Sequence, residues 1–274
     1  MALGATTLGA GSYAYAHDVE PHWIDIAHVS LPLPRLAAAF HGYRLVQMSD
    51  IHMDDTMTPA RLAVIVALVN AQQPDLVAIT GDFVTADAAS DPVALAAVLR
   101  ELRPRDATAA VMGNHDHWWD PVAIRGVMRD GGIVDVDNAV HTLRRGADRL
   151  HIAGVDDYME RQDRLDRVLA VLPSEGAAIL LAHEPDYADI SSASGRFDLQ
   201  ISGHSHGGQL RLPLWGPLIL PRYGTKYPDG RYLIGAMAQY TNRGLGMLRP
   251  HVRFNCRPEI TVFTLQASHP RRDA

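Results

Sequence analysis

Short runs of apolar residues alternate along this chain with longer segments in which apolar residues recur every three or four positions. The short runs are typical of buried strands, and the longer spacing is typical of amphipathic helices. Thr58 followed by Pro59 is a favourable start for the first helix. The alternation of strands and helices, without a linker or an internal repeat, predicts an α/β fold in one domain. Strands are predicted at 44–49, 75–80, 109–112, 150–155, 178–182, 198–202, 232–237 and 260–265, and helices at 61–70, 92–102 and 121–129.

Polar residues gather immediately after several of the predicted strands. In α/β sheets, ligands and catalytic groups collect at the carboxyl ends of the strands, so these residues are expected to lie together. Taken one at a time, each cluster has a simpler interpretation as a turn or a strand-end histidine. Their joint occurrence is what predicts a site. The clusters are Asp50-x-His52, Gly81-Asp82, Gly113-Asn114-His115-Asp116, His183 and Gly203-His204-Ser205-His206.

Composition narrows the chemistry of this site. The net charge is −6, which gives no basic excess for non-specific binding of nucleic acid. The only cysteine is Cys256, so an intrachain disulfide and a zinc site built on thiolates are both excluded. The clusters therefore offer imidazole nitrogen and carboxylate or amide oxygen, a set that suits Zn, Mn, Fe or Co.

A ligand set of this kind can hold two metal ions that act on a phosphoester. Two cations roughly 3.5–4 Å apart neutralise the phosphate oxygens and lower the pKa of a water between them. A carboxylate can bridge the pair, and a nearby histidine can protonate the leaving oxygen. Glycines beside the ligands allow sharp turns and leave room for a substrate.

The motifs D-x-H, G-D, G-N-H-D, H and G-H-x-H, in this order, resemble the signature of the calcineurin-like metallophosphoesterases. The resemblance runs from about Tyr43 to Leu265 and implies a sandwich of two mixed β-sheets flanked by helices. It also implies an enzyme that hydrolyses phosphodiester or pyrophosphate bonds with a metal-bridging hydroxide. Two divalent ions, Mn, Zn or Fe, are the implied cofactors.

The resemblance assigns a role to each motif residue. His115 is the implied acid that protonates the leaving group, and Asp116 is implied to orient it. Asp82 is implied to bridge the two ions. The first ion is assigned to Asp50, His52 and His206, and the second to Asn114, His183 and His204.

A narrower likeness covers the C-terminal third. The segments GHSHGGQLRL at 203–212, NRGLG at 242–246 and FNCRPEI at 254–260 resemble bacterial phosphodiesterases of the YkuE and YaeI type. These are related to UDP-2,3-diacylglucosamine pyrophosphatases, which implies a lipid-linked or cell-envelope substrate, peripheral membrane contact and no nucleic-acid partner. We expect a monomer. Two alternatives are a non-catalytic metal-binding interaction module on the same fold and a nucleotide or general phosphatase; the complete ligand set argues against the first.

The first 16 residues are small, apolar and uncharged, and they allow three interpretations. They are the remnant of an export signal with a cleavage site at Ala14-Tyr15-Ala16, a membrane-proximal anchor, or an ordered N-terminal segment. The domain itself is predicted to span 17–270. An exported or membrane-associated location is favoured, with a cytoplasmic one left open.

An apolar segment, 212–220, follows the last histidine pair closely. It is either a strand or hairpin of the core, or a lipid-facing lip beside the site. Trp118 and Trp119 are candidates to line the pocket. Arg211, Arg222 and Arg243 are candidates for phosphate contact, against the simpler interpretation that each is a surface residue.

Overall fold

The structure is a computed structural model that describes residues 11–86, 88 and 90–268. Residues 1–10 of the predicted export or anchor segment, and the last residues of the predicted domain, lie outside this description. The chain is helical from residue 11 through η1 (Tyr15–Val19) and η2 (Glu20–His22). The carbonyl of Ala16 accepts a hydrogen bond of 2.8 Å from the Arg253 amide, so this helix is attached to the domain at its C-terminal end.

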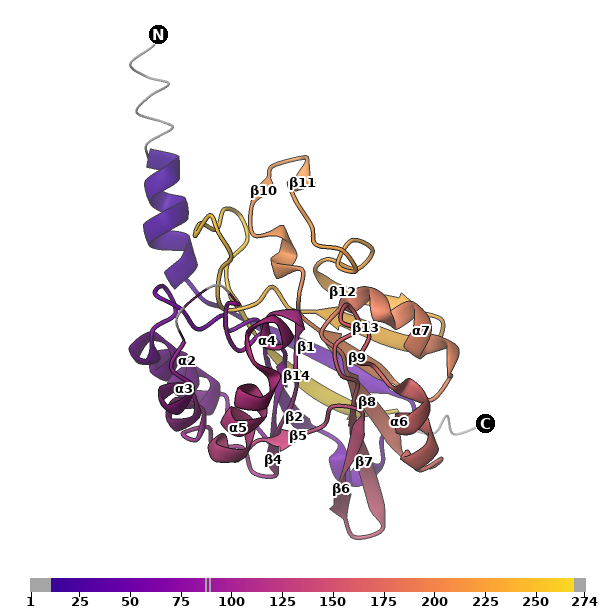
Figure 1. Cartoon of the computed structure of the whole chain (residues 1–274). Helices are drawn as coiled ribbons and strands as arrows, with labels where there is room; N and C mark the ends of the chain where they lie inside the picture. Colours follow the sequence, from indigo (N-terminus) through magenta and orange to yellow (C-terminus); the bar gives the residue numbers. More distant parts are fainter. Residues whose placement is uncertain (1–10, 87, 89, 269–274) are drawn as a thin grey trace.

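Two six-stranded mixed sheets form the body of the molecule (Figure 1). The first sheet has the order β1-β14-β2-β3-β4-β5, and the second has the order β12-β13-β9-β8-β7-β6. The first contains β1 (Asp25–Leu33), β2 (Tyr43–Met48), β3 (Leu76–Thr80), β4 (Ala107–Val111), β5 (Val134–Asp135) and β14 (Glu259–Ala267). The second contains β6 (Ala139–Arg145), β7 (Asp148–Gly154), β8 (Ala177–Leu181), β9 (Leu199–Ser202), β12 (Gly230–Ile234) and β13 (Met237–Thr241).

Helices cover the outer face of each sheet, which gives four layers (Figure 1). Helices α2 (Pro59–Ala71), α3 (Pro92–Leu99) and α5 (Pro121–Gly131) pack on the first sheet. Helices α6 (Leu165–Val171) and α7 (Ala188–Ala193) pack on the second. The predicted α/β sandwich of two mixed sheets flanked by helices is therefore confirmed.

The central strands are apolar without interruption because both of their faces are buried. In β2, Leu45 points into the core between the sheets, whereas its neighbour Val46 packs under the helices. In β3, Ala78 likewise points into the core between the sheets, and Ile79 packs under the helices. Side chains of successive strand residues point to opposite faces, so one apolar run serves two core layers.

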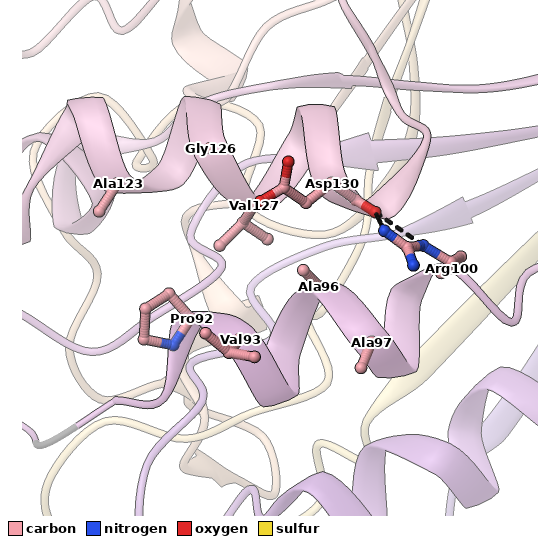
Figure 2. A pocket seen from close by; sticks show the side chains of 9 residues that line it. All are labelled: Pro92, Val93, Ala96, Ala97, Arg100, Ala123, Gly126, Val127 and Asp130. Carbon is pink, nitrogen blue, oxygen red and sulfur yellow. Dashed lines mark hydrogen bonds between the residues drawn. The ribbon is translucent and has the colours of Figure 1, made fainter.

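The three helices over the first sheet share one sequence device at their start. Each begins with a proline at the first helical position, preceded by a residue whose side chain accepts from the first free amides. These residues are Thr58, Asp91 and Asp120. Proline has no amide to leave unpaired at this position, and the cap satisfies one of the other amides in α2 and two in α3 and α5. A shallow groove of about 380 Å³ runs between α3 and α5, lined by Val93, Ala96 and Val127 among others (Figure 2).

Most predicted elements are confirmed, and the misses have local causes. The strand predicted at 232–237 is wrong, because the chain turns at Gly235 and continues as a second strand, β13. Strand β1 was missed because it is an edge strand that contains Pro32 and has a half-exposed pattern. The short helix α4 (Asn114–Trp119) begins within the predicted G-N-H-D turn. The segment 212–220 is not part of the core: it forms an exposed hairpin of β10 (Arg211–Leu212) and β11 (Gly216–Pro217).

Candidate metal centre

The ends of five strands converge on one buried site. Asp50 and His52 follow β2, Asp82 follows β3, and Asn114 follows β4. His183 follows β8, and His204 and His206 follow β9, so both sheets contribute. Each of these side chains belongs to a residue that is at most 5% exposed. The structure therefore brings together every residue that was predicted to hold a metal.

Most of these residues have an unusual backbone conformation. A positive φ is uncommon outside glycine and costs roughly 1–3 kcal/mol at each residue. Here it turns the chain sharply at the strand ends and aims neighbouring side chains into one space. Five of the ligand candidates have φ between 48° and 67°: Asp50, His52, Asp82, His204 and His206.

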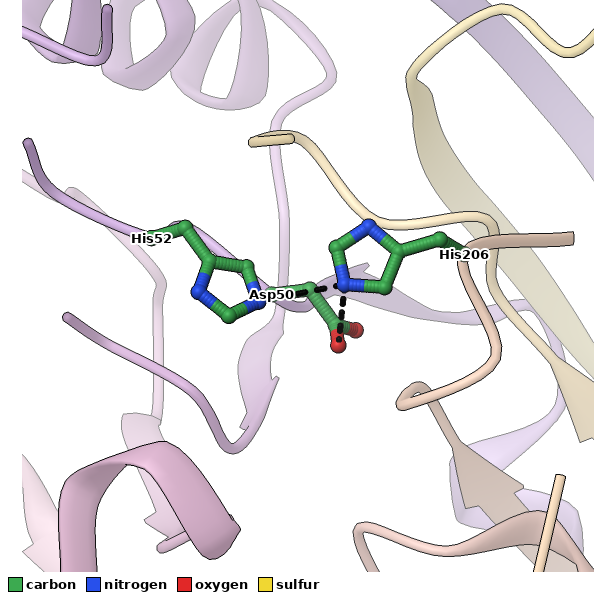
Figure 3. A group of neighbouring side chains, drawn as sticks. All are labelled: Asp50, His52 and His206. Carbon is green, nitrogen blue, oxygen red and sulfur yellow. Dashed lines mark hydrogen bonds and ion pairs between the residues drawn. The ribbon is translucent and has the colours of Figure 1, made fainter. Parts of the chain in front are cut away.

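The first group of ligand atoms contains Asp50, His52 and His206 (Figure 3). The Nε2 atoms of His52 and His206 lie 3.1 Å apart. His206 Nε2 also lies 3.3 Å from an oxygen of Asp50. His52 Nε2 lies 3.4 Å from Asp82 Oδ2, which links this group to the next.

The second group contains His183 and His204, and Asn114 follows Gly113, which lies against Asp82 and His183. His183 Nε2 lies 3.2 Å from His204 Nδ1 and 3.3 Å from the same Asp82 oxygen. The Oδ1 atom of Asn114 is buried and has no hydrogen-bond partner among the described residues. A buried carbonyl oxygen without a partner is costly in a folded protein, and a metal ion would satisfy it.

These spacings fit metal ions of the predicted type. Nitrogen and oxygen ligands bind such ions at about 2.1 Å, so neighbouring ligand atoms on one tetrahedral or octahedral ion are roughly 3.0–3.4 Å apart. The distances above fall in this range. The donor set, histidine and carboxylate with one amide, also suits Zn, Mn or Fe.

Backbone carbonyls orient two of the histidines. Nδ1 of His183 lies 2.7 Å from the carbonyl oxygen of Thr80, and Nε2 of His204 lies 2.8 Å from that of Arg222. Because a carbonyl only accepts, each of these nitrogens carries the proton of the neutral ring. The other nitrogen of each ring is then the one that can bind a metal ion.

Burial and charge set the pKa values of these groups. Burial lowers the pKa of His52 to about 3 and lowers that of His204, which keeps both imidazoles neutral, as ligands must be. Although burial opposes it, His183 holds the pKa of Asp82 well below its usual range. The Asp82 carboxylate in turn raises the pKa of His183, although burial opposes this shift. A metal ion would displace the proton that Asp82 and His183 share.

His115 lies at the edge of the site on α4. Its Nδ1 accepts a hydrogen bond of 3.2 Å from the Ala86 amide, and its ring lies 4.9 Å from that of Trp118. Burial lowers its pKa, so the ring is neutral and carries its proton on Nε2. Nε2 of this neutral ring can therefore donate a hydrogen bond.

Asp116 supports the site by a different contact from the predicted one. Its carboxylate accepts from the amides of Asp82 (2.9 Å), Phe83 (2.8 Å) and Gly113 (2.9 Å). Among the described residues, no hydrogen bond joins it to the His115 ring. It therefore ties together the two loops that carry Asp82 and His115, and any effect on His115 is indirect.

A cavity of about 250 Å³ extends from the site toward the β10–β11 hairpin. His204 and His206 are among its lining residues, and its walls are mostly apolar, with Leu210, Leu218, Ile219, Pro221, Leu248 and Pro250. An apolar pocket with a few polar groups at one end is typical of a ligand site.

The other sequence candidates differ in their surroundings. Trp118 is half exposed beside His115, whereas Trp119 packs on the helical core layer. Arg243 is bound to Asp25 and Glu259 by ion pairs, so it serves the structure. Arg211 pairs with Asp229. Arg222 is exposed and lies over the Tyr223 ring.

Sequence reasoning missed the groups that act through their backbone. The carbonyl of Thr80 and the amide of Ala86 hold His183 and His115, and neither residue type indicates such a role. A side-chain example is Thr85, whose hydroxyl lies 3.4 Å from His52 Nδ1 and 3.3 Å from Asp54. Only its closeness to the Gly81-Asp82 motif could have suggested it.

A two-sheet α/β sandwich with histidine, carboxylate and amide ligands at its strand ends defines a metal-dependent phosphoesterase. The chain belongs to the calcineurin-like phosphoesterase family, whose pattern it matches over residues 43–208. It is 37% identical to the metallophosphoesterase YkuE of Bacillus subtilis, over 98% of this chain and 94% of that one. It is 30% identical to the phosphodiesterase YaeI of Escherichia coli, over 97% of each.

A more distant relative has a named substrate. The chain is 24% identical to the UDP-2,3-diacylglucosamine pyrophosphatase LpxG of Chlamydia trachomatis, over 92% of each chain. The predicted family, its likeness to the YkuE and YaeI type and the class of enzyme are thereby confirmed.

Proposed function

We propose that this protein hydrolyses phosphodiester or pyrophosphate bonds with two divalent metal ions, Mn, Zn or Fe. The observation that carries the proposal is the position of Asp82 Oδ2, at 3.4 Å from His52 Nε2 and 3.3 Å from His183 Nε2. One carboxylate oxygen thus faces both groups of ligands and can bridge two ions. When bound, the ions would neutralise phosphate oxygens and lower the pKa of water.

Each group of residues has its own part in this proposal. Asp50, His52 and His206 would hold the first ion, and Asn114, His183 and His204 the second. His115 would donate a hydrogen bond from Nε2 to the leaving oxygen, and would protonate that oxygen once the ring had taken up a second proton as the imidazolium. The exposed Trp118 ring beside it would form one wall next to the leaving group.

The substrate we propose is lipid-linked. The cavity that leads away from His204 and His206 is apolar and can hold the first part of an acyl chain beside the reacting phosphate. LpxG, by its name, acts on a diacylated sugar nucleotide, and it matches most of this chain. Such a substrate would place the protein at the cell envelope, exported or membrane-associated.

The test measures metal content and hydrolysis together. The protein is stripped with a chelator, reloaded with Mn, Zn, Fe or Mg, and assayed on bis-p-nitrophenyl phosphate. We expect activity to return with metal in the wild type and to be lost in Asp82→Ala, which should also bind less metal. Asp166→Ala, which removes an exposed carboxylate on α6, is the matched control and should behave as wild type.

The outcomes separate the alternatives. Full metal loading without hydrolysis of any phosphoester would support a non-catalytic metal-binding module. For the substrate, kcat/KM is compared between a diacylated sugar-nucleotide pyrophosphate and its deacylated form. A clear preference for the acylated form supports the lipid-linked substrate, whereas equal or better use of the deacylated form would favour a nucleotide or general phosphatase.

A further inference from the structure

The β10–β11 hairpin exposes an unusual amount of apolar surface. Leu214 and Trp215 at its tip are 105% and 85% exposed, and Ile219 is 80% exposed. Leu212 and Leu218 on its two arms are also exposed. Contiguous apolar surface of this kind is rare on soluble proteins and marks a site of contact with a partner or a membrane.

The shape of the hairpin indicates which of these it contacts. Its strands pair at only two positions, Arg211 with Pro217 and Leu212 with Gly216, and Figure 1 shows it projecting beyond the sheets. A protein interface of standard size is broad, with roughly 800 Å² on each side. A narrow convex tip of leucine, tryptophan and isoleucine is instead suited to insertion between lipid headgroups, where tryptophan is enriched.

The N-terminal helix lies on the same side of the molecule. Figure 1 shows it projecting in the same direction as the hairpin. Its Tyr15 packs against Phe254, and both line a hollow together with Pro213 of the hairpin. The chain that precedes this helix, residues 1–10, contains no charged side chain. The described helix therefore enters the domain beside the apolar hairpin.

Two arginines beside the hairpin provide complementary charge. Arg222 follows it directly, and Arg249 lines the cavity beneath it. Both are exposed, and in the described part of the chain neither has a carboxylate within ion-pair distance. Arginine near an apolar insertion site binds lipid phosphate groups and adds electrostatic attraction to an anionic surface.

We infer that the β10–β11 hairpin docks the protein on the surface of an anionic lipid bilayer, with Leu214 and Trp215 inserted among the headgroups. No helix in the described part of the chain is long and apolar enough to cross a bilayer. The cavity between the hairpin and His204 would then open at the lipid surface. The inference concerns binding to the bilayer and does not depend on the proposed hydrolysis.

The test is co-sedimentation of the full chain with vesicles. One set contains phosphatidylcholine alone, and the other contains phosphatidylcholine mixed with phosphatidylglycerol. The wild type should bind the anionic vesicles, and L214S/W215S should bind them at least tenfold more weakly. The matched control is V93S/V122S, which removes two exposed valines of the helical layer: Val93 on α3 (Figure 2) and Val122 on α5, 77% and 78% exposed.

Each outcome decides the matter. Equal binding by wild type and L214S/W215S would overturn the inference, as would the absence of wild-type binding to either vesicle. Loss of binding in V93S/V122S alone would assign the contact to the α3–α5 groove. The inference would also be overturned if the wild type dimerised without binding vesicles while L214S/W215S stayed monomeric. That result would identify the hairpin as a self-association surface. Vesicle binding without hydrolysis of any substrate would leave this inference standing and remove the proposed function.

Discussion

The amide of Ala86 donates a hydrogen bond to Nδ1 of His115 over 3.2 Å. Because a backbone amide can only donate, it holds Nδ1 as the acceptor and leaves the proton of the neutral ring on Nε2. Burial lowers the pKa of His115 and favours this neutral form. The relationship therefore determines that Nε2, and not Nδ1, carries the N–H of the ring.

Replacing His115 should slow hydrolysis most for substrates whose leaving group needs a proton. In His115→Ala, kcat on a diester with an alkyl leaving group should fall roughly 10²–10⁴-fold, the usual contribution of a general acid. Hydrolysis of bis-p-nitrophenyl phosphate should fall much less, because p-nitrophenolate leaves without being protonated. Both rates are measured on protein with matched metal content. An equal loss on the two substrates would show that His115 acts on the metal site or on binding instead.

Asp116 should act on stability and metal retention, since its partners are backbone amides. Asp116→Ala leaves three buried amides without an acceptor, at about 1–3 kcal/mol for each. We expect a large fall in melting temperature and weaker metal binding, measured by thermal unfolding and metal analysis. Asp120→Ala is the control: it removes an exposed helix cap worth about 1 kcal/mol. If both variants unfold at the same temperature, the loop-tying role of Asp116 is wrong.

The strand ends of this site were readable from the sequence because two signals coincide there. Buried parallel strands appear as apolar runs, and the polar ligands directly follow them, as at Asp50 after β2 and Asp82 after β3. Partial signals failed where one strand face is exposed. Strand β1 and the end of β12 at Gly235 were missed for this reason, because exposed positions alternate there with positions that are mostly only half buried.

The geometry inside the site could not be read from residue types. The left-handed backbone of His52, His204 and His206 is set by the packing of both sheets, and histidine itself does not require it. The role of Asp116 was predicted toward His115, but its carboxylate bonds to amides that every residue carries. The apolar run at 212–220 has the composition of a core strand, and only its position beyond the sheets reveals its exposure.

Asp157 should make the stability of the protein depend on pH. Burial, and next the Glu184 carboxylate, raise the pKa of Asp157 to about 9. In the unfolded chain the same group ionises near a pKa of about 3.9, so between these values the folded protein keeps a proton that the unfolded chain releases. Asp157 therefore lowers the free energy of unfolding progressively as pH rises through this window.

The substitution Asp157→Asn should remove this penalty. Its gain in stability should be near zero at about pH 4 and should grow toward pH 9, by at most about 1.4 kcal/mol per pH unit. The amide can retain the bond that Oδ1 accepts from Glu160. Denaturant unfolding at a series of pH values measures the gain in stability of Asp157→Asn over the wild type. The control is Asp166→Asn, which changes an exposed carboxylate. A gain that is constant with pH would contradict the raised pKa.

Gly203 leaves room for a metal ligand, and filling that room should disable the site. A Cβ at this position would overlap Ser49 Oγ and Asp50 Oδ2, and the neighbouring Ser49 Cβ would lie 2.9 Å away. Gly203→Ala should therefore displace the Asp50 carboxylate, lower metal content and activity together, and cost about 1–3 kcal/mol of stability through overpacking. The matched control is Gly126→Ala within α5, where the nearest atom to a new Cβ is 3.6 Å away on Arg129. That variant should keep full metal content and gain roughly 0.5–1 kcal/mol, because alanine is the better helix former. If Gly203→Ala retained its metal and its activity, the close approach of β9 to Asp50 would have no part in building the site.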